Sequence, residues 1–521
     1  MSSSNHDLTG RKHLVTNVLI TWVAQGVYIA AGFVLPRTID HNLGKDILGV
    51  WDFAWSLVGY FGLIQIGVVG SINRFVARYR AQGDVAGVNR AVSSVTCMLA
   101  IMSSVVLMVL WGVHQFVLPR YGAKLGANSN QAELVILILG SEVALQTLFA
   151  GYTGVLTGCH RWKLNTSLQA GGYAVSAFAM VVALLLGAQL TVIAAIHFVG
   201  LLITTVIIVF CAYRAYPQLQ VKPSLASKDE ALQMLGFGTK SFVPQMGELF
   251  LNQTVSVLIL SYLGPAALAV YSRPRNLVSS MKSLVMKMGG VLLPSSGALE
   301  AQGEIEAIRL LAIKTTRYTA YMTVPIAVLL VVMGGPILGV WMGPTYRNGF
   351  LAAILSIGSL LNILQIPVFA ILAGINRHGP PGWAHFASSV LTAGTAWVAL
   401  AVLKCGLVGM AIGAVAPMVL LYVFYMPAYT ARCLKIPVWA YLSGALTGPA
   451  LTGLLFGICL LGCRLAFSNN TVLALVSGCG IGGLCLAPLY WRYALPESLK
   501  ERFARLPTGN LNRPHVPVAP L

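Results

Sequence analysis

Basic side chains gather in one apolar stretch of the sequence, residues 266–296. They are Arg273, Arg275, Lys282 and Lys287. A charged side chain in the centre of a bilayer costs at least about 2.5 kcal/mol, so such residues normally face a cavity or a partner. A cavity with apolar walls and Lys or Arg side chains attracts anions, and the Arg fork matches phosphate oxygens in particular. These residues therefore indicate anion binding. For Lys287 and Arg273, which lie near the two ends of the stretch, the alternative is snorkelling to the interface or internal pairing.

The spacing of the cations decides which of them can act together. Arg275 and Lys282 are seven residues apart, which places them on nearly the same helix face, about 10 Å apart along the axis. Arg273 lies about 200° around the helix from Arg275, although Pro274 between them can bend the helix. Lys240, in the preceding apolar stretch, adds a further cation.

Acidic residues are rare in the apolar stretches, and Asp52, Glu142 and Glu248 are the candidates for coupling or charge pairing. Glu248 shares a helix face with Gln245 and Asn252, which precede and follow it at helical spacing. It either neutralises a basic neighbour in 266–296 or carries a coupling proton. Asp52 and Glu142 are candidates for the same two roles.

The composition fixes the class of protein that must position these groups. Of 521 residues, 57% are hydrophobic and 9% are charged, whereas a soluble domain carries roughly 25% charged residues. A water-soluble fold is excluded. Apolar runs long enough to cross about 30 Å of hydrocarbon as helices recur along the chain. We expect about fourteen transmembrane helices, near 14–36, 48–71, 91–118, 132–157, 166–186, 191–213, 233–262, 266–296, 313–342, 349–375, 385–403, 406–430, 438–463 and 470–491.

The net charge of +19, from 34 Lys and Arg against 15 Asp and Glu, follows from membrane topology. With both termini in the cytoplasm, about 22 basic residues are cytoplasmic and about seven lie on the other side. We therefore expect the lipid bilayer as a partner and no nucleic acid. No loop exceeds about twenty residues, which leaves no room for a soluble catalytic or nucleotide-binding domain. We expect no catalytic residue, no metal and no resident cofactor.

The sequence repeats itself at an offset of 220 residues. Residues 43–84 align without gaps to 263–304, with ten identities in 42 positions and a shared polar loop, AQGD against AQGE. Six spans per copy put both copies on the same side of the membrane, so the repeats are parallel. Transporters of this build bind substrate between their halves and alternate access by rocking.

The second copy differs from the first in charge. Phe53, Trp55, Gly62 and Gly67 of the first copy align with the four cations of the second. The domain organisation that follows is an N-terminal lobe at 1–213, a cytoplasmic linker at 214–232, a C-terminal lobe at 233–430, two further spans at 431–495 and a flexible cytoplasmic tail at 496–521.

Two segments resemble a known family. Residues 43–84 (LGKDILGVWDF to RYRAQGD) and 294–346 (PSSGALEAQGE to GVWMGPTY) are similar to polysaccharide flippases of the multidrug/oligosaccharidyl-lipid/polysaccharide exporter superfamily. In the second segment the resemblance includes a Pro that ends the eighth span and a short helix with a Gly-acid step. The flippase branch often adds two helices to a core of twelve, as the last two spans do here.

The resemblance implies a two-lobed, all-helical transporter in the bacterial cytoplasmic membrane. It would flip a polyprenyl-diphosphate-linked oligosaccharide from the inner to the outer leaflet for surface polysaccharide biosynthesis. The diphosphate would bind Arg275 and Lys282 first, with Arg273 and Lys240 as second candidates. A proton or sodium gradient is the candidate driving force, and a polysaccharide polymerase and assembly proteins are candidate partners.

Three other functions are weighed against this one. A cation-coupled multidrug exporter of the same fold would need an acidic rather than a basic lumen. A membrane polymerase or glycosyltransferase would need a large loop or a carboxylate-metal site, and no Asp-x-Asp motif occurs. An inactive scaffold in an assembly complex is the third alternative. The composition and charges favour the flippase.

Overall fold

A computed structural model describes residues 11–62, 69–239, 242–494 and 500, and within these ranges the chain is helical, with no strand. Eleven of its helices are long and apolar enough to cross a membrane by length and composition. They match eleven of the expected spans. The other three, 14–36, 48–71 and 266–296, are met by α1, by α2 and α4, and by α12. The fold is therefore the expected all-helical membrane type.

The N-terminal lobe is built from helices that precede the linker. These are α1 (Arg11–Leu43), α2 (Lys45–Gly59), α4 (Val69–Ala81), α5 (Val85–Gly112), α6 (Leu118–Leu125), α7 (Ser129–Gly158), α8 (Trp162–Leu185) and α9 (Leu190–Ala215), with a π-helical turn η1 (Val113–Val117) and a 3-10 turn η2 (Gly126–Asn128). The linker holds the 3-10 turn η3 (Pro223–Leu225) and the start of α10 (Lys228–Thr239), a helix that packs on α4 and α5.

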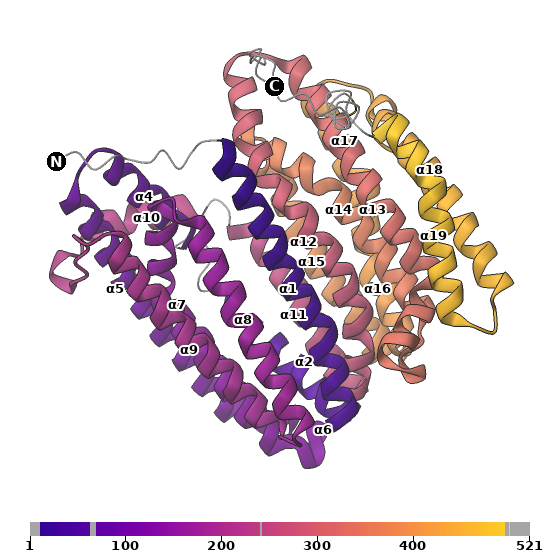
Figure 1. Cartoon of the computed structure of the whole chain (residues 1–521), viewed down its shortest axis with the longest axis horizontal. Coiled ribbons are helices and arrows are strands. Elements are labelled where there is room, and N and C mark those ends of the chain that lie inside the picture. The colour runs from indigo at the N-terminus through magenta and orange to yellow at the C-terminus, as the bar shows by residue number, and fades with distance from the viewer. Residues whose placement is uncertain (1–10, 63–68, 240–241, 495–499, 501–521) are drawn as a thin grey trace, which may run out of the picture.

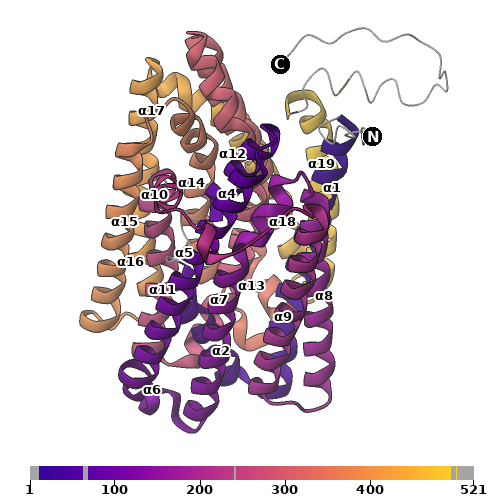
Figure 2. The ribbon, with the colours of Figure 1, turned by 90° about the vertical axis from the view of Figure 1, so that its left-hand side faces the viewer.

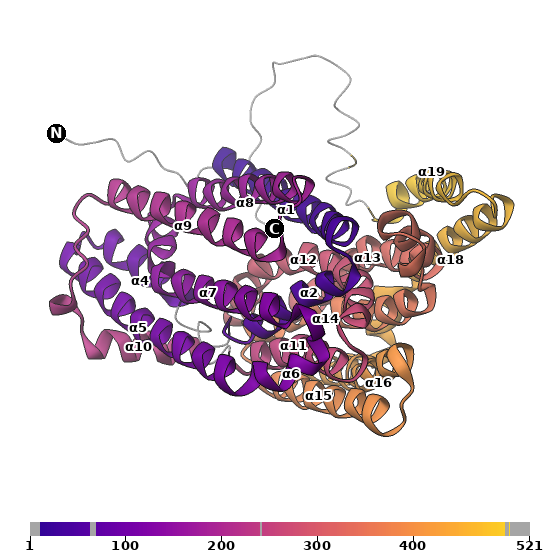
Figure 3. The same ribbon diagram turned by 90° about the horizontal axis from the view of Figure 1, so that it is seen from below.

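The C-terminal lobe repeats this order of long helices. It contains α11 (Phe242–Leu263), α12 (Pro265–Ala301), α13 (Ile305–Met342), α14 (Gly349–Gly374), α15 (Gly379–Trp397), α16 (Gly406–Val419) and α17 (Met426–Leu434), with turns η4 (Pro344–Tyr346), η5 (Val398–Val402) and η6 (Leu420–Tyr425). Two further helices, α18 (Val438–Ala466) and α19 (Thr471–Leu489), end in η7 (Tyr490–Ala494). They pack on α13, at the edge away from the N-terminal lobe (Figure 3).

The backbone confirms the internal repeat. Helices α2 and α12 begin 220 residues apart, and so do α5 and α13, and α7 and α14. The turns before α2 and α12 are also equivalent, because Gly44 and Gly264 have φ of 90° and 85°. Residues with a side chain rarely adopt this conformation, which explains the glycine at both positions. The two copies therefore share their turns as well as their helices.

The apolar core shows where the lobes join. One buried cluster combines residues of α1, α2 and α7 with residues of α11, α12 and α14, and so belongs to both lobes. A second cluster, around Ile72 and Val88, combines the N-terminal lobe with the linker and α10, and a third, around Ile308 and Ile371, combines the C-terminal lobe with α18. The lobes are therefore packed together at one end and separately at the other, and they diverge toward the end that carries α4 and α17 (Figure 1). The described start of α1 lies at that upper end and α6 at the lower one (Figure 2).

Helix α12 differs from the expectation at its end. Pro294 does not terminate it, because the helix continues to Ala301. A proline removes one backbone hydrogen bond, but neighbouring helices and local adjustments compensate for this loss in membrane proteins. The eighth span is consequently one continuous helix that includes both Pro274 and Pro294.

Candidate functional site

The joined end of the lobes is held by side-chain hydrogen bonds as well as by the apolar cluster. The pairs are Gln25–Ser283 at 3.1 Å, Tyr60–Thr254 at 2.7 Å, Tyr121–Ser261 at 3.0 Å, Trp341 to the Phe33 carbonyl at 2.8 Å and Tyr346–Asp40 at 2.5 Å. Each bond crosses from one lobe to the other. Helices α2 and α12 pack against each other in this contact. Asp52 lies on α2, and Arg273 and Arg275 lie on α12.

Arg273 is fully buried where α12 meets α2, and its guanidinium donates to both carboxylate oxygens of Asp52. Within the described residues, its Nε and Nη1 have no hydrogen-bond partner. A buried charge is tolerated in such a place when an opposite charge accompanies it. The structure therefore pairs Asp52 with Arg273 across the two lobes, and in this conformation their contact is a structural link.

Arg275 lies two residues after Arg273 on α12 and has a different environment. Its Nη1 donates to the Asn252 carbonyl at 3.0 Å and to the Ser256 hydroxyl at 2.9 Å, both on α11. Among the described residues no carboxylate forms an ion pair with it. The two arginines thus face different neighbours, as the angle of about 200° between them on a helix predicts.

An interlobe cavity of about 440 Å³ opens beside these side chains. Arg273 and Arg275 line it from α12, and Asp52 and Trp55 line it from α2. Its size falls in the range of roughly 300–1,000 Å³ that is usual for small-molecule sites. The cavity therefore contains two different groups. The Asp52 carboxylate is already paired with Arg273, whereas no ion pair within the described chain neutralises the Arg275 guanidinium.

Lys282 begins a polar network within the C-terminal lobe. Its Nζ lies 2.7 Å from Oε1 of Glu248, whose Oε2 lies 3.7 Å from Nε2 of His385. The Tyr422 hydroxyl is 2.8 Å from Nδ1 of that histidine and accepts from Asn362 Nδ2 at 2.9 Å. Glu248 therefore meets a basic neighbour on α12, which is one of the two roles that its position allows.

Two of the cations cannot be placed in this way. Lys240 lies outside the described residues, and so does the side chain of Lys287, although its backbone belongs to α12. Their roles stay predictions. Among the four candidates for anion binding, the structure brings Arg273 and Arg275 to one cavity and places Lys282 in the adjoining network.

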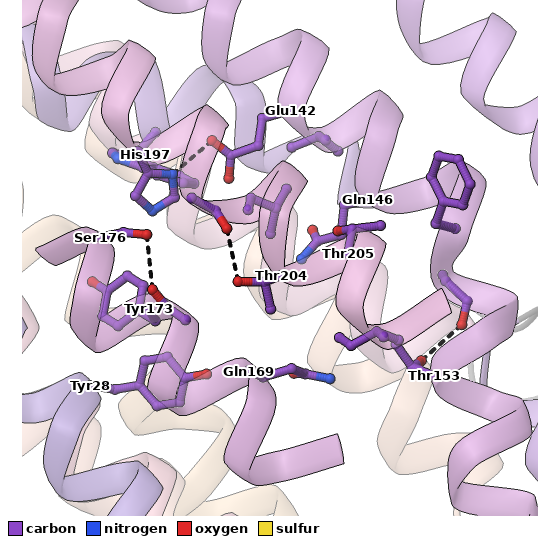
Figure 4. A pocket seen from close by; sticks show the side chains of 18 residues that line it. Tyr28, Glu142, Gln146, Thr153, Gln169, Tyr173, Ser176, His197, Thr204 and Thr205 are labelled. Atoms are coloured by element: carbon purple, nitrogen blue, oxygen red, sulfur yellow. Dashed lines mark hydrogen bonds and ion pairs between the residues drawn. The ribbon is translucent and has the colours of Figure 1, made fainter. Parts of the chain in front are cut away.

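A second cavity, of about 450 Å³, lies inside the N-terminal lobe (Figure 4). Glu142 on α7 and His197 on α9 meet in its wall, with Oε2 of the carboxylate 2.7 Å from Nδ1 of the ring. Both residues are less than a tenth exposed. Trp55 and Tyr173 flank the imidazole edge-on. We call this space the N-terminal cavity.

His197 and His385 were not among the site residues that the sequence indicated. His197 is the partner of Glu142, and His385 is the partner of Glu248, and both acids were among those residues. Each histidine lies on another helix than its acid, far away in the sequence. A histidine within an apolar span is the signal that was available, because a polar side chain there normally has a partner. The identity of that partner depends on which helices pack together, and hydropathy does not reveal this.

Comparisons with known proteins agree with the fold. The family model described as "Polysaccharide biosynthesis protein" matches residues 81–349. The membrane protein EpsK of Bacillus subtilis is 22% identical over 420 residues, which is 79% of this chain and 81% of EpsK. The structure of the lipid II flippase MurJ in an inward closed conformation has a TM-score of 0.68 at 13% identity, covering 92% of this chain and 100% of MurJ.

A second solved structure is similar in the same way. An inward-facing multidrug resistance MATE transporter of the MOP superfamily has a TM-score of 0.64 at 14% identity, covering 80% of this chain and 99% of that one. At these identities the likeness concerns the fold, and the family match extends over about half of the chain. The chain therefore belongs to the polysaccharide biosynthesis protein family and has the fold of the MOP-superfamily transporters and flippases.

Proposed function

We propose that this protein flips a polyprenyl-diphosphate-linked oligosaccharide from the inner to the outer leaflet of the bacterial cytoplasmic membrane. The product would serve surface polysaccharide biosynthesis. Family membership, the two-lobed transporter fold and the basic interlobe cavity support the proposal. The mechanism is alternating access, in which the lobes rock about their joined end and no covalent step takes place.

The environment of Arg275 is the observation that supports the proposal most directly. A guanidinium has five N–H donors, and the contacts to α11 use only its Nη1. The remaining donors have no hydrogen-bond partner in the described part of the chain, and they can meet phosphate oxygens in a bidentate arrangement. Because no ion pair within the described chain neutralises this charge, an anion in the cavity can pair with it directly. We assign the diphosphate to Arg275 first.

Lys282 and Arg273 have supporting roles in the proposal. Lys282 adds positive charge from the same helix, but Glu248 already offsets part of it. Arg273 reaches the cavity wall while it is held by Asp52, so it contributes as a brace between the lobes and as a second candidate ligand. Lys240 keeps its place as a further candidate from the sequence alone.

The orientation and partners belong to the same proposal. We place both termini in the cytoplasm, so that the lobes diverge toward the leaflet on which lipid-linked sugars are assembled. The polyprenyl tail stays in the bilayer, and a polysaccharide polymerase and assembly proteins receive the product. A proton or sodium gradient drives the cycle through Glu248, Glu142 or Asp52.

One observation favours a second function, a cation-coupled multidrug exporter. No Lys or Arg is among the described residues that line the N-terminal cavity, whereas Glu142 is. An organic cation would find a carboxylate there. The interlobe cavity, with two arginines against one paired aspartate, argues against this alternative. Export of organic cations by the reconstituted protein would decide in favour of the exporter.

The test of the proposed function is the cellular level of undecaprenyl-diphosphate-linked sugars. We expect a complete lipid-linked oligosaccharide to accumulate when the gene is deleted, and its mass would identify the substrate. The wild-type gene should relieve the accumulation, and Arg275→Ala at equal membrane abundance should not. Unchanged levels of lipid-linked sugars together with an intact surface polysaccharide would contradict the proposal.

A further inference from the structure

The N-terminal cavity adjoins the interlobe cavity, and the two share part of their walls. Trp55, Tyr173 and His197 line both spaces. A molecule whose anionic group lies at Arg275 therefore has a second chamber directly beside it. The helices α1, α7, α8 and α9 surround this chamber, and their labelled side chains converge on it in Figure 4.

The lining of the N-terminal cavity is polar without being basic. Amides and hydroxyls predominate among its polar side chains, and Glu142 provides the single carboxylate among the described residues that line it. Polar groups inside a membrane bundle are costly and normally serve a ligand or a partner. The neutral polar members are Gln146, Gln169, Thr153, Ser176, Thr204 and Thr205.

The hydrogen-bonding state of these groups suits a ligand that has many hydroxyls. Ser176 and Thr204 donate to carbonyls one turn earlier in their own helices, at 2.9 Å and 2.8 Å. Their oxygens therefore still have lone pairs with which to accept from a ligand. One oxygen of Glu142 is bound by His197, and the other takes no part in that contact. The wall thus offers acceptors and, from its amides, donors.

Aromatic rings complete the lining. Tyr28 and Tyr173 pack together with ring centroids 4.9 Å apart, and Trp55 lies next to His197. The electron-rich face of an aromatic ring favours contact with partly positive C–H groups. Sugar rings present such C–H faces together with hydroxyls at their edges, so a wall of this kind matches both parts of a sugar.

We propose that the N-terminal cavity binds the sugar units next to the diphosphate and that it accepts neutral or N-acetylated sugars rather than acidic ones. The inference rests on the proposed function, because Arg275 must hold the diphosphate for the sugar to reach the cavity. Glu142 provides the charge selectivity, since it repels a uronic acid and no Lys or Arg among the described lining residues attracts one.

The proposal is tested by binding of three lipids to the purified full-length protein. The first is undecaprenyl diphosphate, the second carries a neutral hexose–N-acetylhexosamine disaccharide, and the third has a hexuronic acid in place of the hexose. We expect the neutral sugar to tighten binding about tenfold over the bare diphosphate, which corresponds to one or two hydrogen bonds. The acidic sugar should bring no such gain.

Variants of the cavity locate the effect. Gln146 and Gln169 are exposed to the cavity, so Gln146→Ala/Gln169→Ala should fold normally and bind the neutral sugar lipid no better than the bare diphosphate. The matched control is Gln82→Ala/Gln302→Ala, at two exposed positions related by the repeat and remote from the cavity, which should keep the gain. Thr205→Val serves if the double variant does not fold. Glu142→Gln should improve binding of the acidic sugar.

Three results would overturn the sugar assignment. One is a gain from the neutral sugar that survives the cavity variants, and another is equal binding of the acidic sugar by the wild type. The third is a Glu142→Gln variant that changes only the pH dependence of flipping, which would make the pair a proton site. Failure of the proposed function looks different, because Arg275→Ala would then weaken binding of none of the three diphosphate lipids.

Discussion

The two lobes have the same backbone plan and opposite chemistry. Helices α2 and α12 occupy equivalent places in the repeat, yet α2 has Trp55 where α12 has Arg275. On α7 and α14 the equivalent residues are Glu142, paired with a histidine, and Asn362, bonded to a tyrosine. The C-terminal lobe is thus basic beside the interlobe cavity, and the N-terminal lobe is aromatic, neutral polar and acidic.

The difference shows how a duplicated fold acquires a polarised site. The glycine turns and helix starts are common to both copies, since they determine the backbone. A few side chains that face the cavities differ, since they determine the ligand. In the proposed function the C-terminal lobe holds the diphosphate and the N-terminal lobe holds the sugar.

The largest effect is expected from removal of Asp52, whose carboxylate links α2 to Arg273 on α12. Asp52→Ala leaves the fully buried Arg273 without its partner, and we expect a loss of about 3–5 kcal/mol in the free energy of unfolding. Denaturant unfolding in micelles measures this. Asp46→Ala, the same substitution at an exposed position of α2, is the matched control and should cost far less. If Asp52→Ala is as stable as the wild type, the pair does not link the lobes.

A second prediction concerns a close backbone approach between the lobes, at Gly49. A Cβ atom on Gly49 would lie 1.9 Å from the carbonyl oxygen of Pro265, whereas the equivalent residue on α12 is the buried Ala269. Gly49→Ala should therefore separate α2 from α12 and destabilise the protein by about 1–3 kcal/mol. Thermal unfolding of this variant against Ala269→Gly makes the comparison. An unchanged midpoint for Gly49→Ala would show that the contact can relax.

A third prediction ranks the two cations of α12. Lys282 is already paired with Glu248, so Lys282→Gln should weaken binding of undecaprenyl diphosphate by about tenfold or less, and Arg275→Ala by more. Titration of the two purified variants with this lipid measures the order. Glu248→Gln is the control, and it should tighten binding because it frees Lys282. The reverse order of the two cations would move the diphosphate toward α11 and Lys282.

The smallest expected effect is at the acid of the N-terminal cavity. Glu142→Gln gives this lobe an amide, as Asn362 does in the other, and the amide oxygen can still accept from His197. We therefore expect about 1 kcal/mol or less in the free energy of unfolding. Denaturant unfolding is again the measurement. A loss as large as that of Asp52→Ala would make the Glu142–His197 pair a structural link instead of part of a binding surface.

Much of the fold could be predicted from the sequence, because apolar run length and repeated turns are local properties. Each expected span overlaps one or two helices of the described residues, with 63–68 and 240–241 lying outside them, and the repeat offset of 220 recurs in the helix starts. The prediction that Pro294 ends the eighth span was wrong, since Pro294 lies inside α12. A proline marks a lost hydrogen bond, and whether the helix stops there depends on neighbours that the local sequence does not show.

The site was predictable in its charges and less so in its contacts. Helical spacing separated Arg273 from Arg275, and the structure gives them different neighbours. The partners of Arg273 and Glu142 come from other helices, 221 and 55 residues away in the sequence. Pairing at such distances depends on how the helices pack. Composition and periodicity could therefore identify the candidate residues but not predict which of them form pairs.

The decisive measurement is flipping of an undecaprenyl-diphosphate-linked disaccharide by the purified protein in liposomes. An enzyme that cannot cross the bilayer and cleaves exposed sugar would report the fraction transferred. We predict transfer by the wild type and by Gln82→Ala/Gln302→Ala, and none above empty liposomes by Arg275→Ala at equal incorporation. Transfer by Arg275→Ala at the wild-type rate would contradict a diphosphate site on the C-terminal lobe.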